Sequence, residues 1–513
     1  MSLLVRGKYV LTDPLDLDHG LVRDGAVYIE GNSIRETGAY RDLRRKYPEA
    51  EVLGGETDII MPGIIDAHSH GRGISYVQKG IPYDFLENCL YDWVGAVDLP
   101  PDLNAKLTAV RHIRNGCTTM NHIESVRLFD EKAKDKAEAS LRAYTEMGIR
   151  CAYAPGIKDV NALANDDEDF YETLPERLRE FVRPMIFFDK RAAQDYYINL
   201  FTAMRNSLHG EMTNIILGPT WAHGCTDDFY ARIMELSRSY GGLPMHIHTL
   251  QTPYQKEYGE RKYGKSLLAH LDDLGVVDAN LTLGHGVYVN ESDIELMAEK
   301  QVSLTHHASC NLAMRNGIAP VYELLKAGVN VAMGIDEKQM NDDEDALHEL
   351  RMIFYLHRMS GYGLADTQAI SPRQVLAMGM RNAARTLGLG DRLGTLEAGK
   401  PADIIVVDLT NIERAPWVSP DADILHAFMH RANGRDVRHV IINGNIVMRE
   451  REFTNIDVTE LYAEAAEYMN RTYAAEPSDF QKKMREVKRY HLDWNADKVA
   501  GSREVFYKLN ARK

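Results

Sequence analysis

Residues 60–70 read Ile-Met-Pro-Gly-Ile-Ile-Asp-Ala-His-Ser-His, an apolar run that ends in two histidines one residue apart. Alternate residues of a β-strand point to the same face, so His68 and His70 can direct two imidazoles to one point. Imidazole is a common ligand for zinc and neighbouring transition metals. Two solvated loop histidines would give the same pattern, so a metal site requires further ligands from the rest of the chain.

The composition restricts the class of protein. A chain of 513 residues exceeds one small core and predicts at least two domains. There is no apolar run long enough to span a membrane, and the apolar run at residues 1–10 is too short for a signal peptide. The net charge of −15 disfavours nucleic acid as a partner. The cysteines show no C-x-x-C spacing, which favours a reducing cytoplasm and argues against thiolate zinc sites.

Strand-like and helical segments alternate between residue 60 and about residue 390. This pattern is typical of an α/β fold, a closed (β/α)8 TIM-like barrel, whose active site lies at the carboxyl ends of its strands. The predicted strands are eight short apolar runs, at residues 60–65, 117–120, 150–154, 214–218, 243–248, 280–283, 302–305 and 329–334.

The two ends of this region are β-rich and too small to bury a core alone. Asn443-Gly444 between apolar runs is a strong hairpin signal in the second of them. We therefore expect residues 1–59 and 393–453 to form one composite β-sandwich domain beside a barrel of residues 60–392. Residues 454–513 are predicted to be a helical extension, with Ser478 as an N-cap, that packs on the barrel or on a second subunit.

More candidate ligands follow other predicted strands. His246 and His248 close the fifth strand with the same spacing as the first pair, His285 follows the sixth, and Asp336 follows the eighth. A barrel brings the carboxyl ends of its strands together, so these side chains are expected to converge. After the seventh strand, one of the adjacent residues 306 and 307, both histidines, is expected to face the pocket, but the pattern does not decide which.

Three blocks together resemble the amidohydrolase superfamily: residues 62–70, Gly334-Ile335-Asp336 and residues 399–403. Within it the chain resembles the branch of heterocycle deaminases and triazine chlorohydrolases, on Leu217-Gly218-Pro219, on Asn311 within residues 309–312, and on residues 317–320. The resemblance covers about residues 1–453. It implies a hydrolase that acts on carbon–nitrogen bonds other than peptide bonds.

The resemblance also implies a ligand set. The metal would be held by His68, His70, His248 and Asp336, whereas His285 would contact water or substrate. His246 would be a supporting neighbour, because the family's His-x-x-Glu motif aligns on His248.

The resemblance bears on the number of metal ions as well. Binuclear members bridge two ions with a carboxylated lysine or a glutamate that typically ends strand four, and residues 218–221 contain neither. We therefore expect one divalent ion, with zinc first among zinc, iron and manganese. Lys158, near the end of the third strand, is the nearby lysine that could change this expectation.

The chain departs from the family at Gln251, where deaminases of this branch carry the glutamate that protonates the ring nitrogen. An amide can donate a hydrogen bond but cannot shuttle a proton near neutral pH. Gln251 therefore indicates a changed proton path and favours amide, urea-like, carbamate or lactam substrates. Lys338 is a candidate replacement, with a solvated surface lysine as the alternative. The acidic cluster 342–345 is interpreted as a helix start rather than a second metal site.

The expected function is cleavage of a non-peptide C–N bond in a small cyclic or heteroaromatic compound. The metal makes hydroxide available from water, Asp336 moves its proton and His285 stabilises the developing charge. Trp221 and Asn311 are expected to contact substrate or to support the site. Dechlorination of an s-triazine-like ring and a catalytically inactive scaffold are the alternatives. The partners expected are a small-molecule substrate and further copies of the chain, as a homodimer or larger homo-oligomer.

Overall fold

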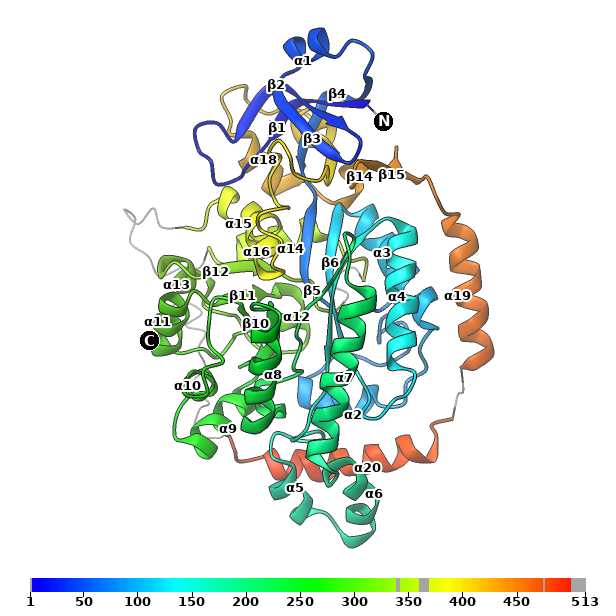
Figure 1. The fold of residues 1–513 in the computed structure, drawn as a ribbon, viewed down its shortest axis with the longest axis vertical. Helices are drawn as coiled ribbons and strands as arrows, with labels where there is room; N and C mark the ends of the chain where they lie inside the picture. Colours follow the sequence, from blue (N-terminus) through cyan, green and yellow to red (C-terminus); the bar gives the residue numbers. More distant parts are fainter. Residues whose placement is uncertain (1, 338–341, 359–368, 474–475, 500–513) are drawn as a thin grey trace.

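The computed structural model describes residues 2–337, 342–358, 369–473 and 476–499. Lys338, the candidate proton carrier, lies outside these residues. Strands from both ends of the chain form one mixed sheet of eight strands, at the top of Figure 1, in the order β16-β15-β14-β13-β4-β1-β2-β3. Its strands are β1 Ser2–Leu11, β2 Leu21–Glu30, β3 Ser33–Ala39, β4 Glu51–Pro62, β13 Ile404–Asp408, β14 Val437–Ile442, β15 Asn445–Arg449 and β16 Glu452–Phe453.

The two ends of the chain join where β4 pairs with β13 in antiparallel register, with Ile60 opposite Val406. The expected association of both ends is therefore confirmed, but the strands form a single mixed sheet where a sandwich was predicted. Both faces of this sheet carry buried apolar side chains, because neighbouring residues of a strand point to opposite faces and consecutive residues of β1 are buried. Leu3 and Val5 of β1 pack in one apolar cluster with Ile404, whereas Leu4 packs in another beside helix α1 Tyr40–Lys46.

The predicted barrel strands form two parallel sheets of four strands each. One contains β5 Ile64–Ser69, β6 Cys117–Ser125, β7 Arg150–Gly156 and β8 Thr213–Ile215, and the other contains β9 Met245–Thr249, β10 Leu281–His285, β11 Ser303–His306 and β12 Asn330–Met333. Residues of β5 and β9 are buried throughout, as expected for parallel strands covered on both faces.

The two sheets meet through isolated bridges, and the closed ladder that the sequence predicted is not formed. Leu217 bridges to Met245 and Trp221 to His248 on one side, and Ser69 bridges to Asp336 on the other. The strand β8 is only three residues long, and Pro219 follows it without the N–H that a longer ladder would need. The strand order around the site is nevertheless the one that the sequence predicted.

Helices connect and cover these strands. Those of the barrel region are α2 Leu86–Trp93, α3 Pro101–Arg114, α4 Ala133–Met147, α5 Asp167–Thr173, α6 Glu176–Ile186, α7 Lys190–Leu208, α8 Asp227–Ser239, α9 Pro253–Tyr263, α10 Leu267–Asp273, α11 Glu291–Lys300, α12 Ala308–Ala313, α13 Val321–Lys326, α14 Ala346–Leu356, α15 Pro372–Met378 and α16 Arg381–Thr386, with the short 3-10 turn η1 Ala222–Gly224. Near the end sheet lie α17 Thr410–Glu413, α18 Ile424–Arg431 and the turn η2 Gly434–Asp436.

The chain ends in two helices, α19 Val458–Thr472 and α20 Asp479–Asn495. Ser478 caps α20 as expected, accepting a hydrogen bond from the backbone N–H of Gln481. Figure 1 shows α20 at the end of the molecule opposite the mixed sheet, next to α2 and α5. Across the described ranges, every helix is too short or too polar to cross a bilayer.

Candidate metal centre

The ends of β5 and β12 bring the first three candidate ligands together. The backbone N–H of Asp336 donates to the carbonyl of His68 over 2.6 Å. Asp336 Oδ1 then lies 3.4 Å from His68 Nε2 and 3.1 Å from His70 Nε2. Asp336 has a φ of +65°, a left-handed backbone conformation that a non-glycine residue adopts at some energetic cost and often at functional sites.

The rings of His70 and His248 are each oriented by a hydrogen bond on the side that faces away from the cluster. His248 Nδ1 lies 2.7 Å from the carbonyl of Thr220, and His70 Nδ1 lies 3.0 Å from the carbonyl of Ile123. A carbonyl only accepts, so Nδ1 carries a proton in both rings and Nε2 of each ring faces the cluster. Such outer contacts commonly fix the orientation of metal-binding histidines. Burial alone would lower the pKa of His70, but the neighbouring carboxylate of Asp336 raises it above its ordinary value.

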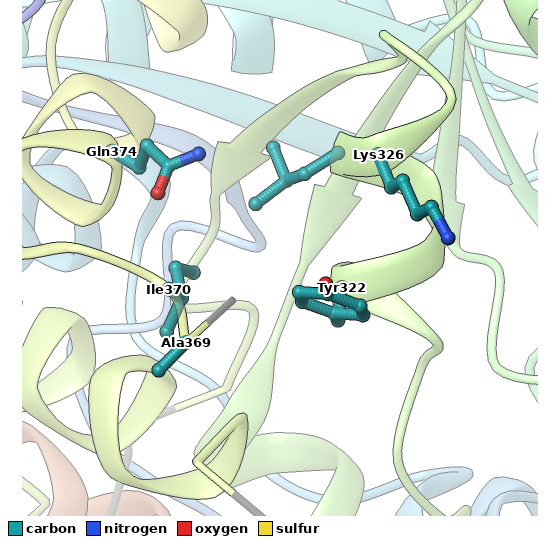
Figure 2. A pocket seen from close by; sticks show the side chains of 6 residues that line it. Tyr322, Lys326, Ala369, Ile370 and Gln374 are labelled. Carbon is teal, nitrogen blue, oxygen red and sulfur yellow. The ribbon is translucent and has the colours of Figure 1, made fainter. Parts of the chain in front are cut away.

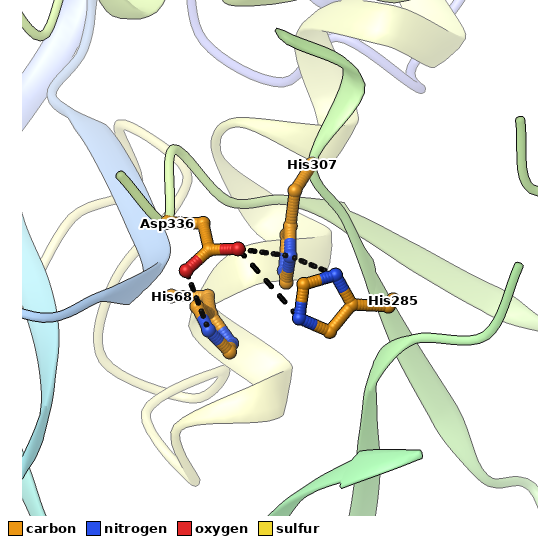
Figure 3. A group of neighbouring side chains, drawn as sticks. All are labelled: His68, His285, His307 and Asp336. Atoms are coloured by element: carbon orange, nitrogen blue, oxygen red, sulfur yellow. Dashed lines mark hydrogen bonds and ion pairs between the residues drawn. The ribbon is translucent and has the colours of Figure 1, made fainter. Parts of the chain in front are cut away.

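Among the described residues, three groups of side chains have ligand atoms close enough to share an ion, and one of them joins His70 and Asp336 with Glu337, which the sequence did not single out. The other two groups share His68. One is His68, His70 and His248, and the other, shown in Figure 3, is His68, His285, His307 and Asp336. His285 Nε2 lies 3.6 Å from Asp336 Oδ2, and its Nδ1 lies 3.0 Å from the Oδ1 of Asn311. All the ligand candidates named from the sequence therefore converge on Asp336 or on His68.

The structure decides between the adjacent histidines after the seventh barrel strand. His307 Nδ1 lies 3.4 Å from Asp336 Oδ2 and 3.2 Å from His285 Nδ1. His306 points elsewhere, with its Nε2 3.0 Å from Nε2 of His357. Neighbouring strand residues face opposite sides, so only one of the two could join the cluster, but the exact end of the strand was needed to say which.

The donor set suits a divalent metal. His68 Nε2 and His285 Nε2 are buried and have no hydrogen-bond partner among the described residues, which is unusual for polar atoms in a protein interior. Burial lowers the pKa of His248 to about 3 and holds the pKa of His68 well below its usual value, so both rings are neutral. Burial alone would raise the pKa of Asp336, but the surrounding histidines, His68 first, hold it well below its ordinary range. Neutral imidazoles with an ionised carboxylate are what metal binding requires.

His246 lies behind the cluster. Its Nε2 is 2.7 Å from Nδ1 of His68, so it orients that ring toward Asp336. The backbone at Gly334 passes close to the candidate ligand His68. A Cβ atom at Gly334 would lie 2.7 Å from the Cβ of His68. Any larger residue at Gly334 would therefore displace a candidate ligand.

A buried carboxylate under the cluster was not recognised from the sequence, although it belongs to the opening motif. Asp66 Oδ1 accepts hydrogen bonds from the backbone N–H groups of His68, at 3.1 Å, and Ile335, at 2.9 Å. Its Oδ2 lies 2.9 Å from Nε2 of His112 on α3. Asp66 thus ties the ends of β5 and β12 together, and only the fold reveals its partners.

The other sequence candidates lie around the cluster with different contacts. Gln251 is buried, and its backbone N–H donates to Oε1 of Gln255. Lys158 donates to the carbonyl of Ala162, and its Nζ lies 4.0 Å from the ring centre of Trp221. Cys310, which the sequence did not single out as a site residue, has its Sγ 3.0 Å from Asp336 Oδ2.

Two further features contribute no ligands to this centre. The carboxylate of Asp345 accepts from the backbone N–H groups of Leu347 and His348, which agrees with the interpretation of residues 342–345 as a helix start. A surface pocket of about 280 Å³ beside α13 and α15 contains none of the cluster residues in its lining (Figure 2), which is Tyr322, Leu325, Lys326, Ala369, Ile370 and Gln374.

Curated proteins resemble this chain in sequence over most of its length. A 5-methylthioadenosine/S-adenosylhomocysteine deaminase of Caldanaerobacter subterraneus subsp. tengcongensis is 28% identical over 479 residues, covering 90% of this chain and 97% of the relative. A 5'-deoxyadenosine deaminase of Methanosarcina mazei is 28% identical over 472 residues, covering 90% of this chain and 96% of the relative.

Solved structures of related enzymes have a similar fold. An adenosine deaminase from Xanthomonas campestris with bound zinc is 25% identical, with a TM-score of 0.74 and coverage of 91% of this chain and 98% of that one. A mutant atrazine chlorohydrolase from Arthrobacter aurescens, in complex with zinc and atraton, is 22% identical and shares the fold with a TM-score of 0.76 over 91% of this chain and 99% of its own. The amidohydrolase family matches residues 59–447, well over half of the sequence, and the chain belongs to this family.

Proposed function

We propose that this protein is a zinc-dependent deaminase that releases ammonia from a small heteroaromatic amine, of the adenosine-derived kind on which its relatives act. The observation that carries the proposal is the buried cluster around Asp336, with its unpartnered imidazole nitrogens, in a chain that aligns with such deaminases over about nine-tenths of its length. The inactive-scaffold alternative is disfavoured because every candidate ligand is present.

We propose His68, His70, His248 and Asp336 as the ligands of a single ion. Support comes from the outer hydrogen bonds of His70 and His248, which turn the Nε2 atoms of both rings toward the cluster. A second ion would need a bridging lysine or glutamate, and Lys158 is engaged with Ala162. His285 and His307 then stand on the Oδ2 side of Asp336, where water or substrate would be held.

The residues divide the chemistry between them. A divalent ion supplies the Lewis acid that makes hydroxide available from water at neutral pH. The ionised Asp336 accepts the proton of the attacking water and returns it to the leaving amine. His285, with its Nδ1 facing Asn311, is held so that Nε2 faces Asp336 and the developing charge.

Gln251 favours a second candidate function, hydrolysis of a cyclic amide or urea-type bond. Such a substrate does not need its ring nitrogen protonated, so the missing glutamate would cost little. Dechlorination of a triazine-like ring uses the same site and is the third possibility. In all three, the substrate is a small molecule and the same ligand set is used.

We also propose the architecture that the sequence predicted: a domain of residues 1–59 and 393–453, a barrel of residues 60–392 and an extension from residue 454. The strand order and the bridges Leu217–Met245 and Ser69–Asp336 support a barrel-type arrangement of the two sheets, which isolated bridges join without a closed ladder. Assembly into a homo-oligomer and a cytoplasmic location stay predictions.

The test is a hydrolysis screen of the zinc-loaded chain. Substrates are 5'-deoxyadenosine, 5-methylthioadenosine, a chlorotriazine and a set of cyclic amides and ureas, with ammonia, chloride and ring opening measured separately. Ammonia release from a purine nucleoside supports the deaminase. Ring opening of an amide without any ammonia release overturns it in favour of the second candidate.

A further inference from the structure

A second buried carboxylate next to Asp336 has an oxygen without a partner. Glu337 follows Asp336 directly and is 4% exposed. Its Oε2 atom is buried and has no hydrogen-bond partner among the described residues. Buried polar atoms almost always have partners, so a group other than these residues is expected at this oxygen. Because the oxygen is closed off from solvent, its partner must be small enough to fit between side chains.

The ends of β5 and β12 bring Glu337 to the metal cluster. Ser69 bridges to Asp336, and Arg72, further along the same segment, has its Nε 3.0 Å from Oε1 of Glu337. Neighbouring residues of an extended strand point to opposite faces. The left-handed φ of +65° at Asp336 interrupts this alternation, and both carboxylates approach His70. Ligand atoms of His70, Asp336 and Glu337 all lie within 4.8 Å of one another.

Arg72 holds the carboxylate of Glu337 by one oxygen. An arginine and a carboxylate that pair for structural reasons frequently meet through two parallel hydrogen bonds. Here Nε of Arg72 donates to Oε1 of Glu337. The guanidinium is itself held by the rings of Tyr76 and Trp93, with its central carbon 4.6 Å and 5.8 Å from the ring centres. Arg72 therefore orients Glu337 and leaves Oε2 for another cation.

The donors around Oε2 suit a metal ion. Two carboxylates close together, here Asp336 and Glu337, repel each other unless a cation lies near both. The imidazole of His70 adds a nitrogen donor to the two carboxylates. Zinc in catalytic sites can expand from four ligands to five, so one ion can accept Glu337 beside the four ligands proposed above.

We propose that Glu337 is a further ligand of the same single ion, through Oε2, and that it extends the choice of metal from zinc toward manganese. This inference rests on the proposed function for the presence of the ion and deepens it by naming a ligand and a metal preference. Imidazole nitrogens suit zinc, whereas carboxylate oxygens suit manganese. A second carboxylate should therefore strengthen the binding of Mn²⁺ more than the binding of Zn²⁺.

The test measures metal binding by the metal-free full chain, with calorimetric titrations of Zn²⁺ and of Mn²⁺. Glu337→Gln keeps the size of the side chain and an oxygen for Arg72, but it replaces Oε2 by an amide nitrogen that only donates. We expect the affinity for Mn²⁺ to fall about 100-fold and the affinity for Zn²⁺ about 10-fold. A merely structural role would weaken both metals by the same factor. Equal losses for the two metals, or no loss for either, overturn the proposal.

The matched control is Asp293→Asn, which removes a buried carboxylate that caps α11 and takes no part in the metal cluster. It should leave both affinities within about 2-fold of the wild type. Glu337→Ser removes the carboxylate with a smaller side chain and serves if Glu337→Gln does not fold. The same unequal loss of Mn²⁺ and Zn²⁺ affinity is expected from it.

The two proposals can fail separately. Metal affinity is measured without substrate, so a chain that hydrolyses none of the screened compounds still tests the role of Glu337. One ion per wild-type chain, with an unequal loss of the two metals in Glu337→Gln, supports the ligand whatever the reaction. Two ions per wild-type chain that fall to one in Glu337→Gln would make Glu337 a bridge between ions and overturn the proposal. A wild type that binds neither metal overturns it as well.

Discussion

The metal cluster and the packed helices α2 and α20 beside it are built differently. The cluster side chains stand at or just beyond the ends of parallel strands, and their outer contacts include backbone carbonyls such as those of Thr220 and Ile123. The two helices are joined by side chains, among them Lys488 of α20 and Asp92 of α2, and α2 packs against Trp221 next to the cluster. Under the proposed function, the ends of the barrel strands carry the chemistry, whereas the loops and short helices around them are placed to contact the substrate.

The largest expected effect separates these two regions. Asp336→Asn removes the proposed base and one ligand, so kcat should fall by at least about 1,000-fold. Nucleoside and free base should lose activity equally, because the cluster acts on the bond that breaks in both. Bound zinc is measured in parallel by atomic absorption. A variant that keeps the wild-type rate would show that Asp336 is not part of the chemistry.

A second substitution tests the departure at Gln251. Gln251→Glu restores the carboxyl group of related deaminases, and general acid catalysis of ring protonation should raise kcat for an aromatic amine about 10- to 100-fold. Gln251→Ala is the matched control and should lower it. If the glutamate variant is no faster on amines, and Gln251→Ala deaminates at the wild-type rate, the changed proton path is wrong.

The stability of the folded protein should depend on pH through His112, which contacts Asp66 beneath the metal cluster. Burial alone would lower the pKa of His112, but the carboxylates of Glu344 and Asp66 raise it to about 10. The folded state therefore holds this proton more tightly than the unfolded chain, whose histidine has a pKa of about 6.5. The stabilisation is complete below about pH 6.5 and is lost as the pH rises through about 10.

Urea unfolding of His112→Gln and of the wild type at several pH values tests the direction of this pH dependence. We expect the free energy of unfolding to fall by about 3 kcal/mol at pH 6.5, because a buried charged partner is lost. The difference from the wild type should shrink toward pH 10. A difference that stays constant with pH would show that His112 is neutral in the folded protein.

The smallest expected effect concerns the contact between α2 and α20. Lys488→Met breaks a partly exposed ion pair with Asp92, so the stability change should be at most about 1 kcal/mol. KM for the best substrate should rise about 2- to 5-fold through looser placement of α2, with kcat unchanged. A fall in kcat with KM unchanged would indicate that α20 supports the metal cluster and not the placement of α2.

The sequence predicted the cluster better than its surroundings, for physical reasons. The i, i+2 spacing of His68 and His70, and the position of Asp336 after a strand, require only strand periodicity and a barrel. The structure was needed to choose His307 over His306, because that choice depends on where the strand ends. Glu337 carries no periodic signal, since its approach to His70 depends on the left-handed turn at Asp336. Closure of the strand ladder was overpredicted because β8 is short and is followed by Pro219.

The central claim is that one metal ion, held by the strand-borne cluster, is required for hydrolysis. The most direct measurement is a titration of the metal-free chain with zinc, following ammonia release from the best substrate and bound zinc per chain together. The account predicts that activity rises in proportion to bound zinc and reaches its plateau at one ion per chain. Activity without metal, or a plateau that requires two ions, would contradict it.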